Sequence, residues 1–103
     1  MSLLNKTYHS ASASAHFYIT FTTADNYTGA LVATAIINGK SGILTGKQTI
    51  GGNYTSIFLN GAIDGKTESW TLVTPDYAAL NGTRNFTDET GQLFSHAFPL
   101  GLI

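Results

Sequence analysis

The chain has 103 residues, a formal net charge of −1 and no cysteine, and only 11% of its residues are charged, against about 25% in an average globular domain. This length supports one domain, residues 1–103, with a small hydrophobic core. The five cations are scattered along the chain, which argues against a nucleic-acid partner. The lack of cysteine excludes disulfides, thiolate nucleophiles and cysteine-based zinc sites.

The amino terminus lacks the basic segment and the apolar run of a signal peptide, and no stretch approaches the length of a membrane span. We therefore expect no membrane partner. We expect either a cytoplasmic protein or one from which a signal peptide has been removed.

The first 15 residues suit either a first strand near Leu3–Ser10 or a flexible lead-in, because serine and alanine alternate at their end. From His16 onward Phe17, Ile19 and Phe21 alternate with more polar residues, which is the period of a half-buried strand. Further strands are expected at Thr28–Ile37, Gly42–Ile50, Asn53–Ile63, Glu68–Thr74, Ala78–Thr87 and Gln92–Leu100. No window has the spacing of an amphipathic helix, so the sequence predicts an all-β fold.

Two-residue turn signals separate the expected strands at nearly regular intervals. They are Asp25-Asn26, Asn38-Gly39, Gly51-Gly52, Asp64-Gly65, Pro75-Asp76 and Asp88-Glu89. Such pairs favour the positive φ angles of tight hairpins, so each strand should fold back antiparallel on its predecessor. A meander of seven or eight such strands has two open edges unless the sheet closes. We therefore predict an antiparallel up-and-down β-barrel rather than a sandwich, whose crossovers need longer connections.

Hairpins centred on these turns place large apolar residues on one face of the sheet. The turns predict that Leu31 faces Gly46, Gln48 faces Thr55, Leu59 faces Trp70, Trp70 faces Leu80 and Arg84 faces Phe94. The resulting inner face collects Phe17, Ile19, Phe21, Leu31, Leu44, Ile57, Leu59, Trp70, Leu72, Leu80, Phe86, Phe94 and Phe98.

Polar residues of the inner face mark the candidate site, because burying one without a partner costs on the order of 1–3 kcal/mol. Gln48, Thr55 and Thr74 lie near the end that carries the turns at residues 25, 51 and 75. The predicted ligand-binding set consists of these three residues with Tyr54, Asp76 and Tyr77 at the same rim, Trp70 in mid-barrel, and His96 and Phe98 on the last strand. Small inner-face residues such as Gly46 and Gly82 leave room for a ligand, or merely fit the taper of the barrel.

No catalytic or metal-binding group follows from the remaining polar residues. His96 suits either a ligand or acid–base role or, as we favour, a core histidine with a satisfied hydrogen bond. Arg84 is expected to meet an anionic ligand or, in preference, to reach the solvated rim. The carboxylates are expected at turns or, for Glu68, on the outward side of its strand, so no acid–base pair converges. The chain is expected not to be an enzyme and to need neither cofactor nor metal.

Four stretches in residues 31–100 resemble the avidin/streptavidin family. Leu44-Thr45-Gly46, Leu59–Asp64, Ser69–Val73 and Leu80-Asn81-Gly82 are similar, in the same order, to its LTG, LxGxxD, GWTVxW and WSG stretches. The resemblance implies an eight-stranded antiparallel barrel with a ligand in its open end, and tetramers of barrels. Trp70 matches one ligand-stacking tryptophan of the family. Leu80 and Phe98 stand where the family has two more, and Gln48 stands where it has a tyrosine, so most of the biotin site is not matched.

These features predict a non-enzymatic barrel that binds a small molecule against Trp70. One alternative is a lectin with shallow sites at the strand ends. The residue types that stack on sugar rings and bind hydroxyls are Asn53, Tyr54, Trp70, Asp76 and Tyr77. Another alternative is a structural or assembly barrel with a filled core. A set of outward-facing apolar residues predicts a homo-oligomer, either dimer or tetramer: Val32, Ile36, Phe58, Val73, Leu93 and Ala97.

Overall fold

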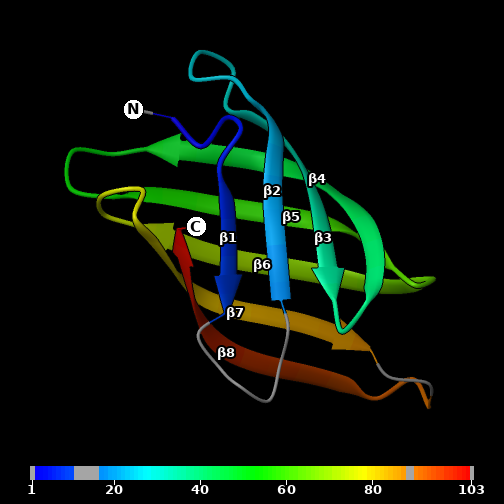
Figure 1. The fold of residues 1–103 in the computed structure, drawn as a ribbon. Helices are drawn as coiled ribbons and strands as arrows, with labels where there is room; N and C mark the ends of the chain where they lie inside the picture. The colour runs from blue at the N-terminus through cyan, green and yellow to red at the C-terminus, as the bar shows by residue number, and fades with distance from the viewer. Residues whose placement is uncertain (1, 11–16, 88–89, 103) are drawn as a thin grey trace.

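Alternating apolar and polar residues form eight antiparallel strands that pair in chain order and close into a barrel (Figure 1). The computed structural model describes residues 2–10, 17–87 and 90–102, with residues 96–98 described by their backbone alone. The strands are β1 (Thr7–Ser10), β2 (Phe17–Ala24), β3 (Ala30–Ile37), β4 (Lys40–Ile50), β5 (Thr55–Ile63), β6 (Lys66–Thr74), β7 (Ala79–Thr87) and β8 (Leu93–Leu102). The predicted all-β barrel is confirmed, and its eighth strand is the short β1.

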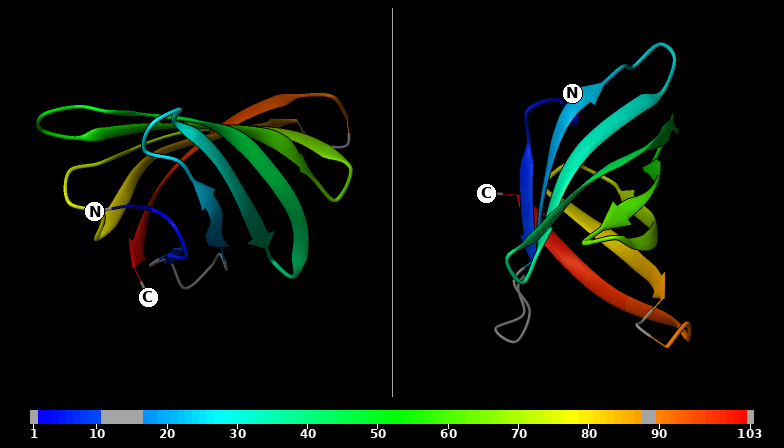
Figure 2. Two further views of the ribbon diagram at one scale, coloured as in Figure 1. Left: turned by 90° about the horizontal axis from the view of Figure 1, so that it is seen from above. Right: turned by 90° about the vertical axis from the view of Figure 1, so that its right-hand side faces the viewer.

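Strands β1–β3 cross at a steep angle over β5–β7, and β4 and β8 bend from one group to the other (Figure 1). The two turned views in Figure 2 show the strong coiling of the sheet. Closure depends on β1, where Tyr8 lies opposite Ile19 of β2 and Leu102 of β8. No helix among the described residues is long and apolar enough to cross a membrane.

The two tight turns predicted at Asn38-Gly39 and Asp64-Gly65 are present. Both residues of each turn have positive φ, 50° and 84° in the first and 55° and 76° in the second. These angles suit the two-residue hairpins that match the twist of the strands. The predicted registers follow, with Leu31 opposite Gly46 and Leu59 opposite Trp70.

The hairpins at Asp25-Asn26, Gly51-Gly52 and Pro75-Asp76 have longer loops than predicted, and the registers predicted for the last two are wrong. Gly51 and Gly52 do not have positive φ, and the Gly51 N–H donates to the Tyr54 carbonyl at 2.9 Å across a four-residue loop. Gln48 therefore faces Ile57 rather than Thr55.

The β6–β7 and β7–β8 registers were also predicted wrongly. The loop before β7 is held by side chains, because the Tyr77 N–H donates to Thr74 Oγ1 at 2.9 Å and the Ala78 N–H to Asp76 Oδ1 at 2.9 Å. Trp70 consequently faces Arg84 rather than Leu80, and Arg84 faces His96 rather than Phe94. The predicted Asp88-Glu89 signal lies outside the described residues. Each register error is an even number of residues, so the inner and outer faces are unchanged.

The inner face forms the core as predicted over most of its length. Ten of the thirteen predicted residues are buried, from Phe17 to Leu80 along the chain. Phe86 is half-buried and Phe94 is 39% exposed, because both lie where the barrel opens; the Phe98 side chain lies outside the described part.

The two ends of the barrel differ in how they are closed. The end with the loops 25–29, 51–54 and 75–78, here called the capped end, is covered by residues 2–6. Leu3 is fully buried there, and the Asn5 N–H donates to the Phe21 carbonyl at 2.8 Å. The opposite end, with the turns 38–39 and 64–65, is here called the open end, because none of the described segments covers it as residues 2–6 cover the capped end.

Glycines on the inner face allow close approach of the neighbouring strand. A Cβ on Gly46 would lie 1.7 Å from the Phe58 carbonyl oxygen, and one on Gly82 would lie 1.9 Å from that of Thr71. Neighbouring backbone therefore occupies the space that the missing side chains would fill. These two glycines permit the coiling of the sheet rather than leaving room for a ligand.

Candidate functional site

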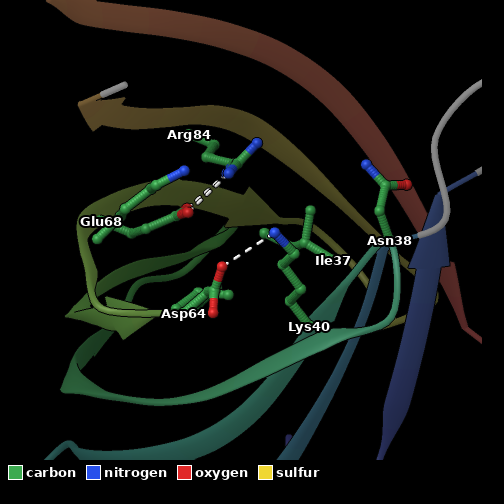
Figure 3. A pocket seen from close by; sticks show the side chains of 8 residues that line it. Ile37, Asn38, Lys40, Asp64, Glu68 and Arg84 are labelled. Carbon is green, nitrogen blue, oxygen red and sulfur yellow. Dashed lines mark hydrogen bonds and ion pairs between the residues drawn. The ribbon is translucent and has the colours of Figure 1, made fainter. Parts of the chain in front are cut away.

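A pocket of about 170 Å³ lies at the open end of the barrel (Figure 3). Its lining comes from the β3–β4 turn, the β5–β6 turn and the neighbouring part of β7: Ile37, Asn38, Lys40, Ile63, Asp64, Lys66, Glu68 and Arg84. The two tight hairpins position most of these residues. The sequence that forms the turns therefore also builds the pocket.

An ion pair joins the two turns at the rim. Lys40 Nζ lies 3.0 Å from Asp64 Oδ2, and both side chains are about half exposed to solvent or more. The hydrogen bond and the positive charge of Lys40 lower the pKa of Asp64 below its usual value. Because the pair is solvated, it orients the rim more than it stabilises the fold.

The floor of the pocket is a buried ion pair between Glu68 of β6 and Arg84 of β7. Arg84 Nε lies 2.5 Å from Glu68 Oε1, and Arg84 Nη2 lies 2.6 Å from Glu68 Oε2. The side chains are only 3% exposed for Glu68 and 11% for Arg84. Two-point pairing of this kind is among the strongest polar contacts in proteins.

Both residues were placed wrongly from the sequence. Glu68 precedes Trp70 by two positions, so it shares the inner face with Trp70 rather than pointing outward. Arg84 does not extend to the solvated rim, because Glu68 supplies a partner inside the barrel.

Two aromatic rings pack against the Arg84 guanidinium. Its Cζ lies 4.0 Å from the ring centroid of Phe86 and 5.4 Å from that of Phe17. Phe86 in turn stacks on Phe94, with ring centroids 5.5 Å apart. Cation–π contacts of this kind contribute roughly 0.5–2 kcal/mol each, depending on desolvation. The rings therefore fix the plane of the guanidinium.

Trp70 supports the ion pair from within the core. Its Nε1–H donates to Glu68 Oε1 at 2.9 Å, and the indole is only 1% exposed. Trp70 does not line the pocket; Glu68 lies between the indole and the open end of β6. A ligand in this pocket would contact the ion pair that Trp70 holds, rather than the indole itself.

Several other predicted site residues gather at the capped end and bond to one another. Thr55 Oγ1 and the Tyr77 hydroxyl are 3.0 Å apart, and the Tyr8 hydroxyl donates to the Tyr77 carbonyl at 2.7 Å. Burial raises the pKa of Tyr8 from 10.0 to about 12, with further contributions from nearby Tyr77 and Asp76. Thr74 is fully buried and accepts from the Tyr77 N–H. This network joins the loop before β7 to the core.

Gln48 also belongs to the capped end. Its Nε2 donates to Asn26 Oδ1 at 3.2 Å and more weakly to the Asp25 carbonyl at 3.4 Å, while its Oε1 is buried with no hydrogen-bond partner among the described residues. Tyr54 is 55% exposed, and Asp76 caps its own loop. The side chains of His96 and Phe98 lie outside the described part of the chain. The structure thus groups Gln48, Thr55, Thr74 and Tyr77 at the end opposite the pocket.

Comparison with known proteins did not identify a relative. No protein-family model, curated protein or solved structure matches this chain. The avidin-like resemblance stays a prediction.

The pocket is suited to binding more than to proton transfer. Glu68 is the carboxylate deepest in the pocket, and both its oxygens already accept hydrogen bonds from Trp70 or Arg84. Asp64 is paired with Lys40. Among the residues that the structure describes, no three histidine, aspartate or glutamate side chains gather as metal ligands would. The pocket therefore presents the Glu68–Arg84 ion pair at its base and the apolar side chains of Ile37 and Ile63 at its sides.

None of the described pocket residues belongs to the predicted ligand-binding set, although Arg84 was considered as a partner for an anionic ligand. The sequence did contain a usable signal. Ile37–Lys40 and Ile63–Glu68 flank the two strongest turn signals, and inward charges next to such turns face a barrel mouth.

Proposed function

We propose that this protein is a non-enzymatic small-ligand-binding barrel whose ligand occupies the pocket at the open end. The observation that carries the proposal is a pocket of about 170 Å³ with a buried, two-point ion pair as its floor. A buried ion pair is a poor means of stabilising a fold, since the loss of hydration offsets much of the attraction. A pair kept next to a pocket is better suited to presenting fixed charge to a ligand.

The size of the pocket limits the ligand to about one ring. A cavity of about 150 Å³ in another protein accommodates benzene, and drug-sized ligands usually occupy about 300–1,000 Å³. A ligand of one six-membered ring with one small polar group fits a volume of about 170 Å³. Ile37 and Ile63 offer apolar contacts, while Asn38 and Arg84 offer hydrogen-bond donors.

The support around Arg84 favours binding by reducing its cost. Glu68 and the rings of Phe17 and Phe86 already restrict the guanidinium. A ligand therefore does not have to immobilise a long side chain, which otherwise costs roughly 0.5–1.5 kcal/mol.

The lectin alternative receives less support. Trp70 is enclosed in the core and is not available to stack on a sugar, and Tyr77 is half-buried with its hydroxyl bonded to Thr55. Of the three aromatic residues considered for sugar binding, only Tyr54 is exposed, at 55%. The remaining alternative is a barrel with only a structural role, which would bind none of the tested compounds.

The test is a screen of ring-sized compounds by calorimetry against two matched variants. Ile37→Trp fills the pocket, whereas Ile36→Trp adds the same bulk to the outer face of the same strand, where Ile36 is 40% exposed. We expect binding to the wild type and to Ile36→Trp, and loss of binding in a folded Ile37→Trp. The proposal fails if no compound binds the wild type, or if Ile37→Trp binds as well as Ile36→Trp.

A further inference from the structure

We propose that the pocket at the open end selects, among uncharged one-ring compounds, those whose polar group accepts hydrogen bonds over those whose polar group only donates them. This inference rests on the proposed function and adds the chemical class of the ligand. It comes from the hydrogen-bonding capacity of the side chains at the base of the pocket.

Arg84 has unused donors on one edge of its guanidinium. A guanidinium has five N–H groups in one plane, and Glu68 accepts from Nε and from Nη2. Within the described part of the chain, Nη1 makes no hydrogen bond. Figure 3 shows one guanidinium nitrogen turned away from Glu68. The edge formed by Nη1 and the second hydrogen of Nη2 can therefore donate two nearly parallel hydrogen bonds to a ligand.

The surroundings of Arg84 direct a ligand to this edge. The rings of Phe86 and Phe17 pack on the guanidinium, 4.0 and 5.4 Å from its Cζ, and Glu68 occupies the edge of Nε and Nη2. A donor that loses its water without gaining an acceptor is costly. A ligand that displaces water from the edge of Nη1 and Nη2 therefore has to supply an acceptor.

The carboxylates of the pocket are already engaged by protein donors. Glu68 is only 3% exposed; its Oε1 accepts from Trp70 and Arg84, and its Oε2 accepts from Arg84. Asp64 is paired with Lys40 at the rim, where its side chain is 49% exposed and water competes for its oxygens. An N–H or O–H group of a ligand would therefore find little acceptor capacity at the base of the pocket.

The first measurement compares benzonitrile with phenylacetylene by calorimetry on the wild type. Both are uncharged rings with a linear substituent of nearly the same length. The nitrile nitrogen accepts a hydrogen bond, whereas the alkyne ends in a weakly donating C–H. We expect benzonitrile to bind about tenfold more tightly, a modest effect for one hydrogen bond from a charged donor. Equal binding, or tighter binding of phenylacetylene, would overturn the inference.

Two variants identify the donor. Arg84→Lys keeps a cation for Glu68 but removes the planar pair of N–H groups. Asn38→Gly removes a side-chain amide that also lines the pocket, at a φ of 50° that glycine tolerates. We expect the preference for benzonitrile to disappear in a folded Arg84→Lys and to persist in Asn38→Gly. The opposite pattern would assign the donor to Asn38 and overturn the inference.

The infrared C≡N stretch of bound benzonitrile gives a readout that does not depend on affinity. A nitrile that accepts a hydrogen bond absorbs at a higher wavenumber than the same nitrile in an apolar site. We expect the higher value in the wild type and the lower value in Glu68→Met/Arg84→Met, which lacks both charged side chains. Emission of the sole tryptophan checks that the core of the double variant is intact. The same wavenumber in both proteins would contradict the inference.

The outcomes separate the two proposals. Phenylacetylene binding as tightly as benzonitrile overturns the acceptor preference and leaves the small-ligand function standing. Failure of both probes, while other ring-sized compounds of the screen bind, has the same consequence. Failure of both probes together with failure of the whole screen overturns both proposals.

Discussion

Glu68 and Arg84 lie diagonally across the β6–β7 ladder, and their side chains join inside the barrel at 2.5 and 2.6 Å. Trp70, directly opposite Arg84, donates to the same carboxylate. The three residues form one unit, because removing Glu68 or Arg84 leaves buried polar groups without a partner, and removing Trp70 takes away one of the two donors to Glu68 Oε1. This unit separates the apolar core from the pocket at the open end.

Removing Glu68 alone should destabilise the fold strongly. Glu68→Ala leaves the Arg84 charge buried and unpaired, and we expect the free energy of unfolding to fall by about 3–5 kcal/mol. The double variant Glu68→Met/Arg84→Met removes both charges and should recover most of that loss. Urea unfolding at neutral pH measures both. A double variant less stable than Glu68→Ala would contradict this account of the pair.

The inner-face glycines make a matched test of strand packing. Gly82→Ala places a Cβ against the Thr71 carbonyl, and we expect a loss of about 1–3 kcal/mol from the forced shift of β6 and β7. Gly101→Ala in β8 is the control, because a Cβ there meets no atom within 4 Å and the residue does not have positive φ. Both variants are measured by urea unfolding. Equal stability of the two would contradict the prediction that the close approach of β6 to Gly82 excludes a side chain.

Tyr8 should make the barrel sensitive to alkaline pH. Its pKa is raised from 10.0 to about 12 by burial, so the folded state retains the Tyr8 proton where the unfolded chain has lost it. The stabilisation is complete below pH 10 and is lost as the pH rises toward 12, on the order of 2 kcal/mol in all.

The control for this pH effect is Tyr8→Phe, which lacks the titrating group and the donor to the Tyr77 carbonyl. Its unfolding free energy should be lower than that of the wild type at neutral pH and should converge with it in strong alkali. Tyr27→Phe, at a fully exposed position, should follow the wild-type curve. Parallel curves for wild type and Tyr8→Phe would contradict the assignment.

We propose that a second copy of the chain covers the outer face of the sheet. Ile43, Phe58 and Val73 are exposed there on the neighbouring strands β4, β5 and β6. Tyr18 and Ile36 are exposed on β2 and β3, which lie on the other side of the barrel (Figure 1). Lys47, which lies opposite Phe58, is the one charged residue at the outward-facing positions of the described strands β2–β7, so this surface carries little charge to oppose burial in an interface. Of the predicted outward set, Val32 is half-buried and the Ala97 side chain lies outside the described part.

Sedimentation at micromolar concentration tests this assembly. We expect a mass that is a multiple of 10.9 kDa for the wild type and a monomer for Phe58→Glu. Ile50→Glu, an exposed apolar position at the capped end, should stay assembled. A monomeric wild type, or an assembled Phe58→Glu, would refute the proposal.

The barrel could be predicted because strand alternation and turn signals act over short distances. Phe17, Ile19 and Phe21 reveal their strand without knowledge of its neighbours. Register was harder, since Gly51-Gly52 is compatible with a two-residue turn and with the four-residue loop that forms. The predicted inner face is nevertheless correct, because every register error is an even number of residues. Leu3 gave no signal, because a single leucine in an irregular segment does not reveal that it caps a barrel.

The pocket was missed because its residues were judged one at a time. Glu68 and Arg84 each look unsuitable for a core, and only their juxtaposition makes burial acceptable. The polar residues chosen instead, Gln48, Thr55 and Thr74, are indeed buried, and Thr55 and Thr74 bond to Tyr77 at the capped end. The alternation of side chains along a strand identifies which polar groups point inward. It does not distinguish a ligand-binding site from a network of hydrogen bonds within the core.

Amide chemical-shift mapping by NMR during a benzonitrile titration tests the central claim most directly. We predict shifts concentrated at residues 37–40 and 63–68 and around Arg84, which line the pocket at the open end. Gln48, Thr55 and Tyr77 at the capped end should be unaffected. Shifts concentrated at the capped end, or no saturable shifts at the open end with any ring-sized compound, would contradict the claim that this pocket is the binding site.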